Sequence, residues 1–78
     1  MKTDSIVDFY KQRCKDKHDA AKIIDVKNST FKDGCLSISI DYETHENKLG
    51  LYTILLIPNT EPYELNIISY HTKEEMNM

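Results

Sequence analysis

Glycine is scarce in this chain, and its scarcity excludes one class of function. Only two glycines are present: Gly34 follows an aspartate in a turn-like segment, and Gly50 lies inside an apolar run. Nucleotide-binding loops use several closely spaced glycines, because their backbone N–H groups must approach a phosphate. Two well-separated glycines cannot form such a loop, so the usual nucleotide-binding motifs are absent.

Cysteine is also scarce, tryptophan is missing, and no apolar run is long. Two cysteines, Cys14 and Cys35, are too few for the disulfide framework of a small secreted domain, so we expect free thiols. The longest apolar run is far too short to span a bilayer, and the first residues lack the apolar core of a signal peptide. These absences predict a cytoplasmic protein that makes no use of a membrane.

What the chain does contain is typical of a small folded domain. It has 78 residues, of which 40% are hydrophobic and 29% charged. This composition is far from the low hydrophobicity of disordered chains, although a domain of this size has a small core. We expect one domain over residues 1–71, followed by a mobile polar tail over residues 72–78.

Charge is distributed unevenly along the sequence. The net charge is −3, and residues 1–39 carry eight basic and six acidic residues while residues 40–78 carry two and seven. An acidic surface repels phosphate backbones, so the sequence does not favour nucleic-acid binding and instead predicts contact with a basic protein surface. The acidic candidates for that contact are Asp41, Glu43, Glu46, Glu61 and Glu64. The competing interpretation is an ordinary solvated surface.

The N-terminal segment has the pattern of an amphipathic helix. Asp4 and Ser5 can cap it, and Ile6, Tyr10 and Cys14 recur at helical spacing on one side. The helix is expected to run to about residue 17, and the pattern leaves open whether it continues beyond that point.

An Asp-Gly turn predicts a hairpin between residues 23–31 and 35–43. The second of these strands alternates cleanly between apolar and polar residues. The turn sets the expected cross-strand pairs, which are Thr30 with Leu36, Asn28 with Ile38, Val26 with Ile40 and Ile24 with Tyr42.

Residues 49–57 are apolar at both odd and even positions, which predicts a central strand that ends at Pro58. Residues 63–70 predict a fourth strand. Together these elements predict an α+β fold in which an N-terminal helix packs on a four-stranded antiparallel meander, in the order α-β-β-β-β. The alternative order is α-α-β-β-β, with a second helix over residues 19–27.

No residue pattern indicates catalysis, a metal or a cofactor. The three histidines, His18, His45 and His71, lack the short spacing of metal ligands, and no acidic pair has the surroundings of a catalytic pair. The sequence therefore predicts a non-enzymatic domain that binds another protein as an inhibitor or regulator, a type common among viral and mobile-element products. The alternative is a small ligand-binding protein or enzyme with a pocket between helix and sheet, near Tyr10, Tyr42 and Tyr52.

Because the predicted strand over residues 49–57 is apolar on both sides, both faces of the sheet carry apolar residues. A single helix can cover only one of these faces. The residues assigned to this second face are Leu51, Leu55, Ile57, Ile68 and Tyr70. Monomeric proteins rarely expose a large apolar patch, so this face is expected to contact either a second copy of the chain, as a homodimer, or a different protein.

Overall fold

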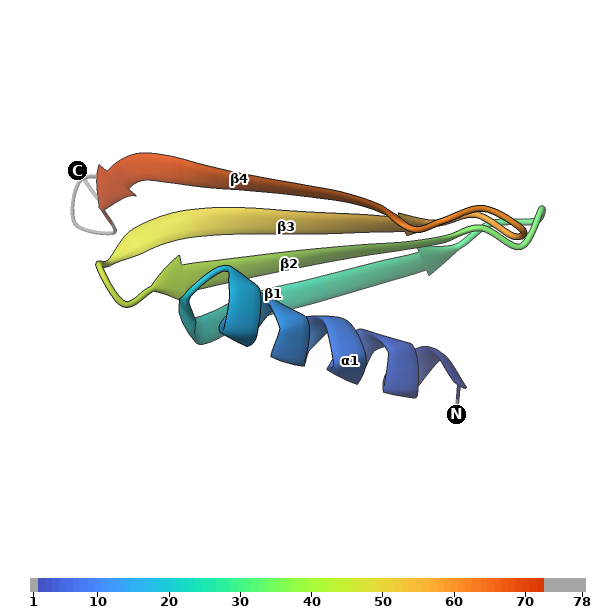
Figure 1. Ribbon diagram of the computed structural model, residues 1–78, viewed down its shortest axis with the longest axis horizontal. Coiled ribbons are helices and arrows are strands. Elements are labelled where there is room, and N and C mark those ends of the chain that lie inside the picture. Colours follow the sequence, from blue (N-terminus) through green and yellow to red (C-terminus); the bar gives the residue numbers. More distant parts are fainter. Residues whose placement is uncertain (1, 73–78) are drawn as a thin grey trace.

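The computed structural model describes residues 2–72. Its elements are helix α1 (Lys2–Lys17) and strands β1 (Ala20–Thr30), β2 (Leu36–Thr44), β3 (Lys48–Leu56) and β4 (Tyr63–Thr72). The strands form one antiparallel sheet in the order β1-β2-β3-β4 (Figure 1). This architecture confirms the predicted α-β-β-β-β order and excludes a second helix over residues 19–27, most of which belong to β1. Thr72 ends β4, and the rest of the predicted tail lies outside the described residues.

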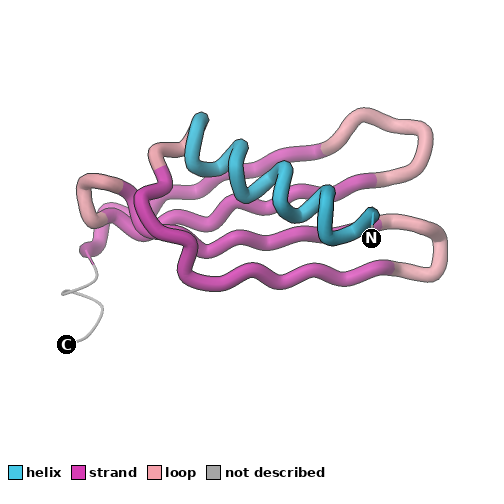
Figure 2. Tube along the Cα trace, turned by 90° about the horizontal axis from the view of Figure 1, so that it is seen from below, coloured by secondary structure: helices cyan, strands magenta, loops and turns pink. Residues whose placement is uncertain are grey.

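Helix α1 lies across a single face of the sheet (Figure 2). The helix ends where the His18 backbone N–H donates to the Cys14 carbonyl at 3.0 Å. Asp19 then turns the chain into β1 with a φ of 58°, and its carboxylate lies 2.8 Å from the His45 ring in the turn between β2 and β3. Because the chain goes directly from the helix into the sheet, no described helix or strand covers the opposite face.

The core lies between α1 and the sheet. Tyr10 and Cys14 are one turn apart on the helix and point at the same side, so both enter the core. The side chains without exposed surface are Cys14, Ile38, Ile40, Tyr42, Tyr52 and Ile54. The β2 residues among them alternate with partly exposed ones, which confirms the amphipathic pattern predicted for that strand.

The turn between β1 and β2 has the predicted three-residue form. Gly34 adopts a φ of 88°, a left-handed conformation that glycine tolerates without strain. The Phe31 N–H donates to the Cys35 carbonyl at 2.8 Å, and the Asp33 carboxylate accepts from the Cys35 N–H at 3.2 Å. The turn thereby fixes the register near it, as predicted.

The predicted register of β1 and β2 holds close to the turn and fails farther along. Three predicted pairs are observed, between Thr30 and Leu36, Asn28 and Ile38, and Val26 and Ile40. A bulge between Ile23 and Asp25 then puts Ile23, instead of Ile24, opposite Tyr42. A bulge adds one residue to one strand, which an alternation pattern cannot reveal when two isoleucines are adjacent.

The face assignment predicted for β4 was wrong by one residue. Leu65 pairs with Thr53 and Ile67 pairs with Leu51, so both lie on the face turned away from the helix. Ile68 pairs with Gly50 on the helix side, although it was predicted on the other face. Apolar residues occur at both odd and even positions of β4, so the sequence pattern does not show which residues face the helix. The register is set by the loop over residues 57–62.

The two thiols differ in burial, and this difference predicts different reactivity. Both are free, with Cys14 buried and Cys35 partly exposed, and burial raises the pKa of Cys14 to about 11. At pH 8, iodoacetamide should modify Cys35 in the native protein while Cys14 reacts only after denaturation, because the thiolate is the nucleophile. Peptide mass spectrometry would measure this. Equal rates at the two cysteines in the native protein would contradict the buried position of Cys14.

Candidate functional site

The sheet face turned away from α1, called the open face here, presents side chains in three cross-strand rows of four residues and in one shorter row of Lys22, Glu43 and Leu49. The pairing register sets their order from β1 to β4. The rows of four are Asp25, Asp41, Leu51 and Ile67; Lys27, Ser39, Thr53 and Leu65; and Ser29, Ser37, Leu55 and Tyr63. The two halves of the open face thus differ in chemistry, since β1 and β2 contribute polar groups and β3 and β4 contribute mainly apolar ones.

The half built by β3 and β4, called the apolar half, exposes large side chains to solvent. Four of its members are more than a third exposed, namely Leu51 at 38%, Leu65 at 44%, Ile67 at 54% and Tyr63 at 59%. Single exposed apolar residues are common on protein surfaces, but neighbours on adjacent strands form a continuous patch. The apolar half is therefore the feature of this fold that most resembles a binding surface.

Sequence reasoning found part of this surface and missed part of it. Leu51 and Leu55 lie in the rows of the open face, as predicted, and Ile57 is exposed just beyond the end of β3. Ile68 lies on the other face, and the side chain of Tyr70 is outside the described part of the structure. The members that the sequence did not assign to this face are Leu49, Tyr63, Leu65 and Ile67. Only the register of β4, set by the loop before it, could have identified the last three.

The five acidic candidates do not form one surface. Asp41 and Glu43 alternate along β2 on the open face, where Glu43 pairs with Leu49. Glu46 lies in the turn between β2 and β3, and Glu61 lies in the loop between β3 and β4. These connections are at opposite ends of the sheet (Figure 1), and Glu64 is on the helix side. Only the first two acids flank the apolar half.

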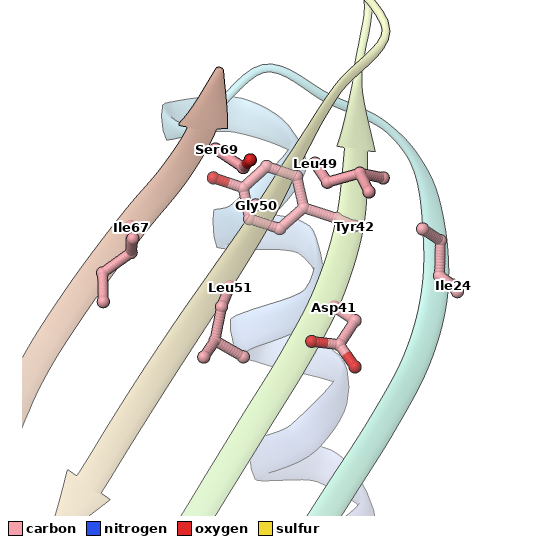
Figure 3. A pocket seen from close by; sticks show the side chains of 8 residues that line it. All are labelled: Ile24, Asp41, Tyr42, Leu49, Gly50, Leu51, Ile67 and Ser69. Atoms are coloured by element: carbon pink, nitrogen blue, oxygen red, sulfur yellow. The ribbon is translucent and has the colours of Figure 1, made fainter. Parts of the chain in front are cut away.

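A hollow of about 430 Å³ opens on the open face where the polar and apolar halves meet (Figure 3). Its wall is formed by Ile24, Asp41, Tyr42, Leu49, Gly50, Leu51, Ile67 and Ser69. Ile24 reaches this side because the bulge in β1 shifts the alternation by one residue. The hollow therefore combines aliphatic walls with one carboxylate, that of Asp41.

A second cluster lies on the helix side, at the edge between the end of α1 and β4. Glu64 accepts hydrogen bonds from Arg13, at 2.8 Å, and from the Tyr52 hydroxyl. The ring of His18 lies 4.6 Å from that of Tyr52. Lys17 and Asn66 complete a hollow of about 390 Å³. Hydrogen bonds from Tyr52 and Arg13 lower the pKa of Glu64, which keeps this carboxylate ionised and unsuited to donating a proton at neutral pH.

The lowered pKa of Glu64 predicts how stability depends on pH. Its carboxylate is favoured in the folded state, so its contribution is complete above its ordinary pKa of 4.5 and is lost as the pH falls through the lower folded value. Glu64→Gln should therefore lose less stability than the wild type between about pH 5 and pH 3. Urea unfolding at several pH values would show this. Parallel curves for the two proteins would mean that the contact with Arg13 and Tyr52 does not form.

The three tyrosines that were predicted to surround a pocket between helix and sheet belong to the core, and Tyr42 and Tyr52 also reach the walls of the two hollows. Tyr10, Tyr42 and Tyr52 are buried, and their rings fill the space between helix and sheet. The helix-side hollow lies beside Tyr52, at the edge of the core.

The described residues were not found to form a metal site or a membrane-spanning helix. Within residues 2–72 no group of three or more His, Cys, Asp or Glu side chains is placed to hold a metal ion. Helix α1 is too short and too polar to cross a membrane.

Comparisons with known proteins leave the chain without a relative from which a role could be transferred. No protein-family model, no curated protein and no solved structure matches it. Its function must therefore be inferred from its own surfaces.

Proposed function

We propose that this protein is a non-enzymatic domain that binds another protein through the apolar half of its open face, and that it acts as an inhibitor or regulator of that protein. The proposal rests on one observation. Leu51, Leu65 and Ile67 occupy adjacent positions on two neighbouring strands, each is more than a third exposed, and no described element covers them. Covering such a patch with a partner removes apolar surface from water, which is the main driving force of protein association.

The dimensions of the apolar half favour a segment of a partner over a second copy of the sheet. Two strands side by side give a strip about 10 Å wide, and seven residues give a length of about 20 Å. A stable interface buries about 800 Å² on each partner, so a face-to-face dimer of two sheets would also have to bury the polar half of the open face, including Asp25 and Asp41. A single helix is about 10 Å wide, so it matches the strip. The proposed partner therefore presents one helix or strand, with apolar residues facing β3 and β4.

The charges around the strip favour a basic partner segment. Asp41 and Glu43 border the apolar half on β2, and Asp25 lies beside Asp41 on β1. Complementary charge at the rim of an apolar contact increases the rate of association and discriminates against wrong partners. We therefore expect the partner segment to carry lysine or arginine on the side that faces β2.

Affinity capture followed by reconstitution tests the proposed function. The immobilised protein would be exposed to extracts of its native cells in parallel with Leu65→Glu, and proteins retained only by the wild type would be identified, purified and rebound. The proposal requires at least one such protein to form a complex of defined mass with the pure domain. A domain that retains no protein specifically, or that retains the same proteins after Leu65→Glu, would contradict it.

A homodimer is a distinct outcome that sedimentation would detect. Because a face-to-face dimer would bury the polar half of the open face, we expect a monomer at micromolar concentration in the absence of a partner. A dimer that Leu65→Glu dissociates, with the fold intact, would mean that a second copy of the chain occupies the open face.

A further inference from the structure

The hollow on the open face combines aliphatic walls with a carboxylate, which suits the binding of a long side chain. Aliphatic groups of Leu49, Leu51 and Ile67 form one wall, and Ile24 contributes from β1. Asp41 stands on β2 between these groups, as Figure 3 shows. A group that entered from β4 would pass over Leu51 before it reached the carboxylate, because Ile67, Leu51 and Asp41 belong to one cross-strand row.

The carboxylate of Asp41 is part of an uncompensated acidic pair. Asp25 is its direct cross-strand partner, and like charges at opposite positions of an antiparallel pair repel. Neither carboxylate forms an ion pair or a hydrogen bond with any residue in the described range 2–72. Lys27, in the next row of β1, does not form an ion pair with either of them. The free protein therefore holds two negative charges side by side at the edge of an apolar hollow.

We propose that this hollow receives a lysine or arginine side chain of the protein partner. The proposal rests on the proposed function and specifies which chemistry the open face recognises. Lysine and arginine have an apolar stem and a cationic head, so the stem can pack over Leu51 and Ile67 while the head reaches Asp41 and Asp25. The head relieves the repulsion between the two carboxylates, and the aliphatic walls limit the access of water to the ion pair.

The proposal can be tested on the isolated protein with a side-chain analogue. Butylguanidinium would be titrated into the protein labelled at its isoleucine, leucine and backbone amide groups, and chemical shifts would be followed by NMR. We expect saturable shifts at Leu51, Ile67 and Asp41, with a dissociation constant in the millimolar range that is usual for so small a ligand. Butylurea, which has the same shape without the charge, should bind at least about fivefold more weakly.

Three variants separate a specific site from general attraction to an acidic protein. Asp41→Asn and Asp25→Asn should each weaken butylguanidinium binding by about fivefold, whereas Asp8→Asn, at an exposed acid of α1, should leave it unchanged. Asp41→Asn should also raise the melting temperature by about 1–5 °C, because it relieves the repulsion from Asp25. A lower melting temperature would contradict the proposal, since it would mean that Asp41 already has a favourable partner.

The result distinguishes this inference from the proposed function. Shifts spread evenly over the surface, equal binding of butylurea, or a loss of binding in Asp8→Asn as large as in Asp41→Asn would overturn the cationic site. Capture of a partner by the wild type, lost in Leu65→Glu and unchanged in Asp41→Asn, would also overturn it and would leave the proposed function standing. If the proposed function is wrong, the wild-type protein will capture no specific partner in the affinity experiment.

Discussion

Replacing Gly50 with alanine is expected to lower the free energy of unfolding by about 3–5 kcal/mol, because one methyl group would overpack the core and break a partly buried hydrogen bond. A Cβ at this position would lie 2.3 Å from Cζ of Tyr42 and 2.6 Å from its hydroxyl oxygen. The ring cannot move aside freely, since it is fully buried and its hydroxyl donates to Asn66 at 2.5 Å. Gly50 is therefore required by the position of Tyr42.

The expected loss is a large share of the stability of a domain of this size, which is about 4–12 kcal/mol. Urea unfolding would measure it, and the melting temperature should fall by at least about 12 °C. Tyr42→Leu removes the atoms that the new methyl group would meet, so it provides the control. In that background Gly50→Ala should cost less than about 1 kcal/mol, and an equal cost in both backgrounds would contradict the close approach of Tyr42 to Gly50.

Leu65→Glu is expected to weaken binding of the proposed partner at least about 100-fold, because it would bury a carboxylate in an apolar contact. Leu65 lies in the middle row of the open face and is 44% exposed. The free protein should therefore tolerate the change, with a melting temperature within a few degrees of the wild type. Titration calorimetry with the reconstituted partner would give the ratio of affinities.

Phe9→Glu is the matched control for this variant. It makes the same exchange of a large exposed apolar side chain for a carboxylate, but on helix α1, away from the open face. It removes an edge-to-face contact with Tyr10, which should cost at most about 1.5 kcal/mol of stability. Partner affinity should be unchanged. If the two variants weaken binding equally, the apolar half is not the binding surface.

The parts of the fold that the sequence predicted are those in which local pattern and turn chemistry agree. In β2, Leu36, Ile38 and Ile40 alternate with polar residues, and the Asp-Gly turn beside them sets the register, so one arrangement satisfies both. In β4, the apolar residues Leu65 and Ile68 point to opposite faces of the sheet, and no tight turn precedes the strand. The face of β4 therefore depended on pairing with β3, which is a tertiary property.

The candidate surfaces were harder to predict because they depend on contacts between distant residues. Arg13 and Glu64 are 51 residues apart and meet only when α1 crosses the sheet. Glu64 was consequently expected on an acidic binding surface, whereas it forms an ion pair with Arg13 of the same chain. The predicted hairpin register already sets Asp25 opposite Asp41, but the hollow beside them also needs Ile24, which reaches the open face only through the bulge in β1.

The most direct test of the proposed binding surface is NMR of the complex between the isoleucine- and leucine-labelled protein and its reconstituted partner. On binding, the methyl groups of Leu51, Leu65 and Ile67 should change shift strongly, since they lie on the open face. The methyl groups of Ile38 and Ile54, buried under α1, should change little. Strong changes confined to residues of α1, with Leu65 and Ile67 unaffected, would show that the partner binds the helix side and would contradict the proposed function.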